Sequence, residues 1–231
     1  GCVRDALLGR EPADWDITTS ASPYEVKALF SRTIDTGIQH GTVTVMLGKE
    51  GFEVTTYRVD GEYEDCRHPK EVQFTKSLLE DLKRRDFTIN AMAYNPAEGL
   101  IDEFDGAGDL KRGIIRCVGD AEARFGEDAL RMMRAVRFGA QLGFELEEQT
   151  REAVKKLCEN LRKVSAERIQ TELVKMLVDH VSKGGNMLLN VGPTGRGTFD
   201  PRSSQILKEL TAENVICFAA THDIELTHIL D

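Results

Sequence analysis

The sequence predicts an α/β (α+β) head with a small mixed sheet of five strands or fewer, then an all-helical neck and an irregular C-terminal tail. Two β-rich runs over 42–47 and 52–59 are separated by GKEG, which is typical of a hairpin. Helical character extends over 120–177, and the sequence beyond it is rich in glycine, serine and proline. We therefore expect a head over 1–118, a neck over 119–177 and a tail over 178–231.

The segment before the hairpin predicts four elements in order. A short helix over 2–8 is followed by a turn over 9–13 and a strand over 14–18. Ser-Pro then opens a second helix over 22–30.

The segment after the hairpin predicts a change from sheet to helix. Residues 76–95 (KSLLEDLKRRDFTINAMAYN) predict a helix that leads into a loop and a further helix or strand, and 100–119 predict a second hairpin with a glycine-rich connection. In the neck, we expect Asp120 and Ser165 to be N-caps and Gly143 a C-cap.

Composition limits the function classes. No run of eighteen apolar residues and no signal-peptide pattern occurs, so the expected location is the cytoplasm. Five widely spaced cysteines without a CxxC pattern argue against disulfides or a zinc site. The net charge of -9 requires any RNA contact to be local.

A pair of carboxylates is the first candidate site. Asp14 and Asp16 flank Trp15 on the predicted strand, and the period of two places both carboxylates on one face, with Trp15 and Ile17 on the other. Two such carboxylates suit Mg²⁺ and phosphoryl transfer. The same pattern is also common on solvated turns, so the pair alone leaves both interpretations open.

The context favours the metal interpretation. Gly1 and Arg4 lie at a turn that enters a helix, where a close backbone and a guanidinium can hold a triphosphate. Glu53 shares a strand face with Thr55 and Tyr57, and is either a third carboxylate beside the pair or an ordinary solvent-facing residue.

A helix in the neck has a stripe of arginines. Arg131, Arg134 and Arg137 recur at i, i+3 and i+6. The stripe is expected to face away from an apolar set consisting of Ala129, Met133, Val136 and Ala140. It is either a nucleotide-binding face or a solvated face that pairs with Glu127 and Glu145. Gly139 interrupts this helix at a cost of about 1 kcal/mol.

Four motifs in this order and spacing, GCVRDALLGREPADWDITT, HGTVTVML, RRDFTINAMAYN and GEDALRMMRAVRFGAQLGF, resemble the bacterial class II CCA-adding enzyme and poly(A) polymerase family. The resemblance covers 1 to about 177. It implies a nucleotidyltransferase head and a template-independent enzyme that joins CTP and ATP to tRNA 3′ ends. It also implies Mg²⁺ and a two-metal attack of the RNA 3′-hydroxyl on the α-phosphate.

The resemblance assigns roles to matching positions. Mg²⁺ falls on Asp14 and Asp16. Glu53 is a further catalytic candidate on its strand position alone, not through the resemblance. Base selection falls on Asp128 and Arg131, because an Asp accepts from the exocyclic amine of C or A and an Arg donates to ring acceptors. The remaining nucleotide-binding positions are Gly1, Arg4, Arg85 with its neighbours Arg84 and Asn90, Arg134 and Arg137.

Two rival functions remain. Poly(A) addition shares the head motifs, and acceptance of CTP separates the two activities. A catalytically inactive nucleotide- or RNA-binding fragment is the other rival, because the sequence begins inside a Gly-x-x-Arg motif and lacks the family's first strand and tRNA-binding body. The expectation is thus an N-terminally truncated head.

The tail resembles two other families. Residues 181–200 resemble α-L-fucosidases and 203–230 resemble mismatch-repair ATPases. The first stretch lacks a separated pair of catalytic carboxylates and the second lacks a GxxxxGK[ST] loop, so neither activity is expected. The sequence predicts a chimeric tail without a catalytic role.

Overall fold

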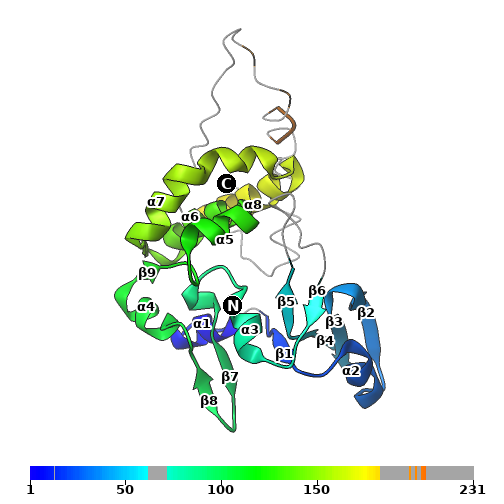
Figure 1. Cartoon of the computed structure of the whole chain (residues 1–231). Coiled ribbons are helices and arrows are strands. Elements are labelled where there is room, and N and C mark those ends of the chain that lie inside the picture. Colours follow the sequence, from blue (N-terminus) through cyan, green and yellow to red (C-terminus); the bar gives the residue numbers. More distant parts are fainter. Residues whose placement is uncertain (13, 62–71, 183–197, 199–200, 202–203, 207–231) are drawn as a thin grey trace.

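The computed structural model describes the chain apart from residues 13, 62–71, 183–197, 199–200, 202–203 and 207–231 (Figure 1). The strands are β1 (Ile17–Thr19), β2 (Thr33–Gly37), β3 (Thr42–Leu47), β4 (Glu50–Thr56), β5 (Arg58–Asp60), β6 (Val72–Phe74), β7 (Ala93–Asn95), β8 (Gly99–Ile101), β9 (Ile114–Ile115) and β10 (Glu145–Leu146). The α-helices are α1 (Cys2–Leu7), α2 (Pro23–Leu29), α3 (Leu78–Lys83), α4 (Gly106–Arg112), α5 (Ala121–Glu127), α6 (Leu130–Leu142), α7 (Glu148–Leu157) and α8 (Ala166–Ser182). Short 3₁₀ helices lie at Ile38–His40, Thr88–Asn90 and Cys158–Lys163.

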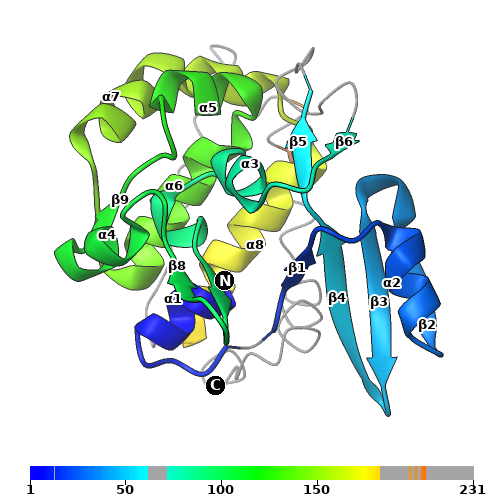
Figure 2. The same ribbon diagram turned by 60° about the horizontal axis from the view of Figure 1, so that its bottom comes forward.

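The largest sheet is small and mixed, as predicted. Its strand order is β1-β4-β3-β2, with β1 parallel to β4 and the other neighbours antiparallel (Figure 2). The predicted hairpin is β3 and β4. Helix α2 covers one face of this sheet, where Val26 packs with Val43, Val45 and Val54. A capping box between Ser22 and Glu25 fixes the start of α2.

The uncovered face of the sheet is lined with hydroxyl groups. Residue pairing places Thr18 beside Thr55 and Thr55 beside Thr42, so three threonines form a row across β1, β4 and β3. Because side chains alternate along a strand, this face is opposite the valines that pack against α2. The row therefore points away from the core beneath α2.

The predicted strand over 14–18 begins later than expected. Pairing with β4 starts at Ile17, so Asp14 and Asp16 precede the strand. Trp15 and Ile17, which are expected on the face opposite the carboxylates, are 56% and 45% exposed.

The predicted second hairpin over 100–119 is wrong. Strand β8 pairs with β7, and the glycine-rich connection forms α4. Asp102 starts this helix, because its carboxylate accepts the N–H groups of Gly106 and Ala107 at 2.7 and 2.8 Å. A Cβ on Gly106 would lie 2.3 Å from the carbonyl oxygen of Thr88, so a glycine permits this close approach.

The neck is helical with the expected caps at two of three positions. The side chain of Asp120 accepts the N–H of Ala123 at 2.7 Å, and Gly143 ends α6 with φ of 71°. Ser165 precedes α8, but its hydroxyl has no hydrogen-bond partner within the described residues. Gly139 has a packing reason, because a Cβ there would lie 3.2 Å from the carbonyl oxygen of Phe144.

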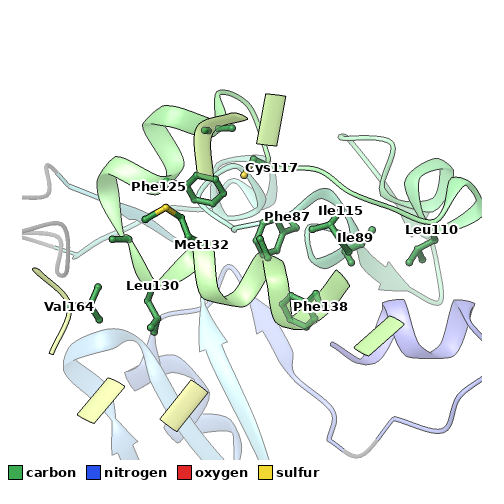
Figure 3. Packing of buried hydrophobic residues seen from close by; sticks show 14 of the residues in the cluster. Phe87, Ile89, Leu110, Ile115, Cys117, Phe125, Leu130, Met132, Phe138 and Val164 are labelled. Carbon is green, nitrogen blue, oxygen red and sulfur yellow. The ribbon is translucent and has the colours of Figure 1, made fainter. Parts of the chain in front are cut away.

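The main hydrophobic core contains residues from both the expected head and the expected neck. Phe87 and Ile89 pack in one cluster with Phe125, Phe138 and Val164 (Figure 3). The rings of Phe87 and Phe138 meet edge to face, with centroids 5.9 Å apart. The segment 86–92 is thus built into the same core as α5 and α6.

Among the helices of the described residues, none has both the length and the apolar character needed to cross a membrane.

Candidate active site

A cleft of about 810 Å³ lies between the hydroxyl-lined sheet face and the helical part. The predicted residues that line it are Gly1, Arg4, Arg84, Asp16, Arg85, Asn90, Asp128, Arg131 and Arg134. Asp14, Glu53 and Arg137 are predicted residues that do not line it. Residues separated by more than a hundred positions in the sequence therefore meet at one cleft.

One wall of the cleft bears a carboxylate and hydroxyl groups. Asp16 lines it together with Thr18, Thr42 and Thr55. Asp14 lies nearby, because a Cβ on Gly1 would be 3.9 Å from its Oδ1. Within the described residues, no hydrogen bond or ion pair engages either carboxylate, so the oxygens of Asp14 and Asp16 are available as ligands.

The two aspartates suit Mg²⁺ better than they suit a metal ion that is held entirely by protein ligands. In the part of the chain that the structure describes, no three His, Cys, Asp or Glu side chains are close enough to share a metal. Glu53 is exposed on the hydroxyl-lined face, opposite Thr44. Mg²⁺ commonly binds through one or two carboxylates and completes its shell with water and phosphate oxygens. Two available aspartates meet that requirement.

The opposite wall of the cleft is cationic. A chain of hydrogen bonds that begins at Arg4 forms part of it. Arg4 donates from Nη1 to Oδ1 of Asn90 at 2.8 Å, and Asn90 donates from Nδ2 to Oδ1 of Asp86 at 3.1 Å. The rest of the Arg4 guanidinium bonds the Asp5 carboxylate at 2.8 and 2.9 Å. Arg4 is thereby held in a fixed orientation at the cleft.

Asp86 is the buried centre of this wall. Its Oδ2 accepts a hydrogen bond from Nε of Arg134 at 2.7 Å and forms an ion pair with Nη2 at 2.6 Å. Its Oδ1 also accepts the N–H of Phe87 at 2.8 Å. Burial alone would raise the pKa of Asp86, but the Arg134 guanidinium and the hydrogen bonds from Asn90 and Phe87 outweigh it and lower that pKa below 3.8. Asp86 therefore remains ionised and holds Arg134.

The adjacent arginines are positioned by Asp81 of α3. This buried carboxylate accepts from Nε and Nη2 of Arg84 at 3.0 and 2.8 Å and from Nη2 of Arg85 at 3.2 Å. The buried Nε of Arg85 has no hydrogen-bond partner within the described residues. The Arg85 side chain as a whole is 30% exposed and lines the cleft, so its guanidinium can reach an anionic ligand there.

The arginine stripe of α6 is not a solvated face. Arg131 is 9% exposed, and its guanidinium donates to Glu127 at 2.7 Å and to the backbone carbonyls of Arg124 and Arg84 at 3.2 and 3.1 Å. Its expected partner Glu127 is thus confirmed, but the pair is largely buried. The expected apolar face is also shifted, since Val136 is 44% exposed while Ala135 and Phe138 are buried.

Arg137 is held away from the cleft. Its Nε donates to Oε2 of Glu172 at 2.7 Å, and Glu172 of α8 is buried. The guanidinium carbons of Arg4, Arg134 and Arg137 lie 5.1, 5.3 and 4.3 Å from the ring centroid of Phe138. Arg137 therefore contributes to this packed cluster, without lining the cleft itself.

The sequence interpretation missed three residues of this arrangement. Asp86, Arg168 and Glu172 hold predicted residues that are 35 to 48 positions away in the sequence. Arg168 also lines the cleft and pairs with Asp128 at 2.8 Å. Asp86 lies within the quoted RRD motif, whereas Arg168 and Glu172 resemble ordinary charged residues of an amphipathic helix. No local pattern distinguishes those two.

Comparisons with known proteins agree with this geometry. The family model for the poly A polymerase head domain matches residues 1–116, and the model for alpha-L-fucosidase matches residues 159–212. The second match includes the tail stretch 181–200, most of which lies outside the described residues, as does most of the mismatch-repair-like stretch 203–230.

Curated relatives match over the head and neck. The chain is 58% identical over 183 residues to a CCA-adding enzyme of Lactobacillus delbrueckii subsp. bulgaricus, which covers 79% of this chain and 46% of that protein. It is 59% identical over 176 residues to a CCA-adding enzyme of Lactobacillus helveticus, covering 76% of this chain and 44% of that protein. The chain thus spans less than half the length of these relatives.

Solved structures match in fold. The Bacillus stearothermophilus CCA-adding enzyme in complex with CTP aligns with a TM-score of 0.71 at 49% identity, covering 77% of this chain and 43% of that chain. A CCA-adding enzyme in complex with ATP aligns with a TM-score of 0.61 at 28% identity, covering 96% of this chain and 44% of that chain.

Proposed function

The chain belongs to the poly(A) polymerase head family, to which CCA-adding enzymes are related, and we propose that it supplies the nucleotide-adding site of a CCA-adding tRNA nucleotidyltransferase. The reaction joins CTP and ATP to the 3′ end of tRNA without a nucleic-acid template. The observation that supports this proposal best is the asymmetry of the cleft. One wall bears Asp16 and hydroxyl groups, and the other bears arginines.

The cationic wall is suited to a nucleoside triphosphate. Arg85 lines the cleft with a side chain that is 30% exposed, and Arg4 and Arg134 line the same cleft in fixed orientations. Guanidinium groups that are already oriented bind phosphate oxygens with a smaller loss of side-chain entropy. We assign triphosphate binding to this wall, with Gly1 close to the acidic pair.

The junction between α5 and α6 is suited to the base. Asp128 ends α5 in an extended conformation and lines the cleft beside Arg131, the first arginine of the α6 stripe. An Asp accepts a hydrogen bond from the exocyclic amine of C or A, and an Arg donates to their ring acceptors. UTP and GTP present a carbonyl where the amine would be, which leaves Asp128 without a donor. The neck region 119–177 would thereby select CTP and ATP.

Asp14 and Asp16 are suited to binding the metal ion at which the RNA 3′-hydroxyl attacks the nucleotide. Asp14 and Asp16 are the residues that would hold Mg²⁺, and Glu53, which does not line the cleft, is left out of this assignment. Mg²⁺ bound there would neutralise phosphate charge and orient the attacking hydroxyl. The chain's own contribution is to place Asp16, with Asp14 nearby, across the cleft from the arginines.

Nucleotide binding and RNA extension by the 231-residue chain test the proposal. Isothermal titration with CTP, ATP, UTP and GTP in Mg²⁺ should give measurable affinity for CTP and ATP and much weaker affinity for the other two. Incubation with a tRNA that ends before CCA should give extension with CTP and ATP, and Asp16→Ala should abolish it. Extension that is unchanged in Asp16→Ala would refute the metal assignment.

The same experiment separates the two rivals. A poly(A)-adding enzyme would extend RNA with ATP and ignore CTP. A chain that binds CTP and ATP selectively without extending tRNA would be a nucleotide-binding part that needs further segments for catalysis.

A further inference from the structure

Helix α8 supplies an arginine that holds the proposed base-selecting aspartate. Arg168 donates from Nη2 to Oδ2 of Asp128 at 2.8 Å and from Nη1 to Oδ1 at 3.3 Å. The two residues are 40 positions apart, and both line the cleft. A guanidinium that contacts both oxygens fixes the plane of the carboxylate as well as its position.

The number of acceptor positions left on Asp128 follows from these bonds. Its Oδ1 also accepts the backbone N–H of Leu130 at 3.1 Å. An ionised carboxylate has about four acceptor positions, two on each oxygen. Leu130 and Arg168 occupy both positions of Oδ1, and Arg168 occupies one position of Oδ2. One acceptor position on Oδ2 remains.

One remaining acceptor position matches the chemistry of the proposed substrates. The Watson–Crick edge of cytosine and of adenine offers one exocyclic-amine hydrogen in this direction. Uracil and guanine offer a carbonyl oxygen there, which a carboxylate oxygen repels. An aspartate whose carboxylate is fixed with one acceptor position left is therefore selective in a way that a rotating aspartate is not.

We propose that Arg168 is a positioning residue for base selection, acting through Asp128. This inference rests on the proposed function, in which Asp128 accepts from the base. Without Arg168, the strongest attraction on the carboxylate comes from other guanidiniums of the site, including Arg134, with which Asp128 already interacts electrostatically. Asp128 would then turn toward the arginines and lose its orientation toward the base.

A purely structural role for Arg168 predicts a different result. In that case the ion pair only ties α8 to the junction of α5 and α6, and its loss weakens every nucleotide equally or lowers stability alone. The ratio of the dissociation constants for UTP and CTP distinguishes the two roles, because a structural tie does not change that ratio.

Isothermal titration of the full chain in Mg²⁺ provides the test. Arg168→Ala should weaken CTP and ATP and leave UTP nearly unchanged, so that the UTP-to-CTP ratio falls by about 10-fold, as expected for one lost base-specific hydrogen bond. Arg168→Lys should recover part of the ratio, because an ammonium restores the charge without the two-point contact. The control is Arg151→Ala, which removes an exposed arginine paired with Glu148 on α7 and should leave every affinity unchanged.

Two outcomes would overturn the inference, and a third would overturn the proposed function. An unchanged ratio in Arg168→Ala, or equal weakening of CTP and UTP, would make Arg168 a structural tie. If Arg168→Ala does not unfold cooperatively, the test depends on Arg168→Lys. Its ratio of the dissociation constants for UTP and CTP must be lower than that of the parent chain. A parent chain that does not prefer CTP to UTP would instead refute base selection by Asp128 itself.

Discussion

Asp86 and Arg134 join the two sides of the core at the cleft, with Nε and Nη2 of the guanidinium 2.7 and 2.6 Å from Oδ2 of the carboxylate. Asp86 comes from the segment between α3 and the 3₁₀ helix at Thr88–Asn90, and Arg134 comes from α6. Through Asn90 the same carboxylate is linked to Arg4. The site therefore depends on one buried ion pair for the orientation of two proposed phosphate-binding residues.

Replacing Asp86 by Ala should destabilise the fold. Arg134 would lose its main partner, and Asn90 would lose a hydrogen bond. Removing one member of a buried ion pair costs about 3–5 kcal/mol, and we expect about 3 kcal/mol here because Arg134 is partly exposed. Urea unfolding measures the change in free energy. The control Glu152→Ala removes an exposed partner of Lys155 and should cost less than about 1 kcal/mol. Equal losses in the two variants would contradict this prediction.

Asp86 should also make the protein sensitive to acid. Its pKa in the folded state lies below the ordinary value of 3.8, so the stability that it contributes is fully present above pH 3.8 and is lost as the pH falls through the folded value. Melting temperatures between pH 5 and pH 3 should therefore fall more steeply for the parent chain than for Asp86→Asn. Parallel curves would mean that the ionisation of Asp86 does not contribute.

Replacing Arg85 by Ala should weaken nucleotide binding with little effect on stability. A charged donor to phosphate would be lost, so the dissociation constants of CTP and ATP should rise about 10- to 100-fold. The buried Asp81 keeps its bonds to Arg84. Isothermal titration and thermal melts measure the two effects.

The control for Arg85 is Arg112→Ala, which removes one of two arginines from another buried aspartate, Asp109. That aspartate keeps bonds to Arg116 at 3.1 Å and to Thr88 at 2.7 Å, and Arg112 does not line the cleft. Nucleotide affinity should be unchanged in this variant. A similar loss of affinity in both variants would show that Arg85 acts through the fold and not through the ligand.

Two glycine substitutions should change the free energy of unfolding in opposite directions. Gly106→Ala places a Cβ 2.3 Å from the carbonyl oxygen of Thr88, so the backbone must move and about 1–3 kcal/mol should be lost. Gly126→Ala in α5 meets no atom within 4 Å and should gain about 0.5–1 kcal/mol from helix propensity. Chemical denaturation of both variants tests the packing of α4 against the 3₁₀ helix at Thr88–Asn90.

Local chemistry explains what could be predicted from the sequence. The start of a helix at Ser-Pro, the N-cap at Asp120 and the C-cap at Gly143 depend on neighbours within a few residues, and these predictions are confirmed. The β3–β4 hairpin likewise depends on alternation and a short turn.

Distant partners explain what could not be predicted. Helix α4 replaces the predicted hairpin, and its buried Asp109 accepts a hydrogen bond from Thr88, 21 positions earlier. The shift of β1 depends on where β4 pairs with it, and the pairing of Asp128 with Arg168 spans two helices. These contacts join positions that are too far apart for a local window of sequence to show them.

The shared core has a mechanical consequence for the cleft. Phe87, Phe125 and Phe138 pack in one cluster, so the segment that contains Arg85 and the helix that contains Arg134 cannot separate unless that cluster opens. The four-stranded sheet has a small core of its own around Val43 and Val54. The arginine wall is accordingly tied together by one continuous core, whereas the sheet that bears the opposite wall packs around separate valines.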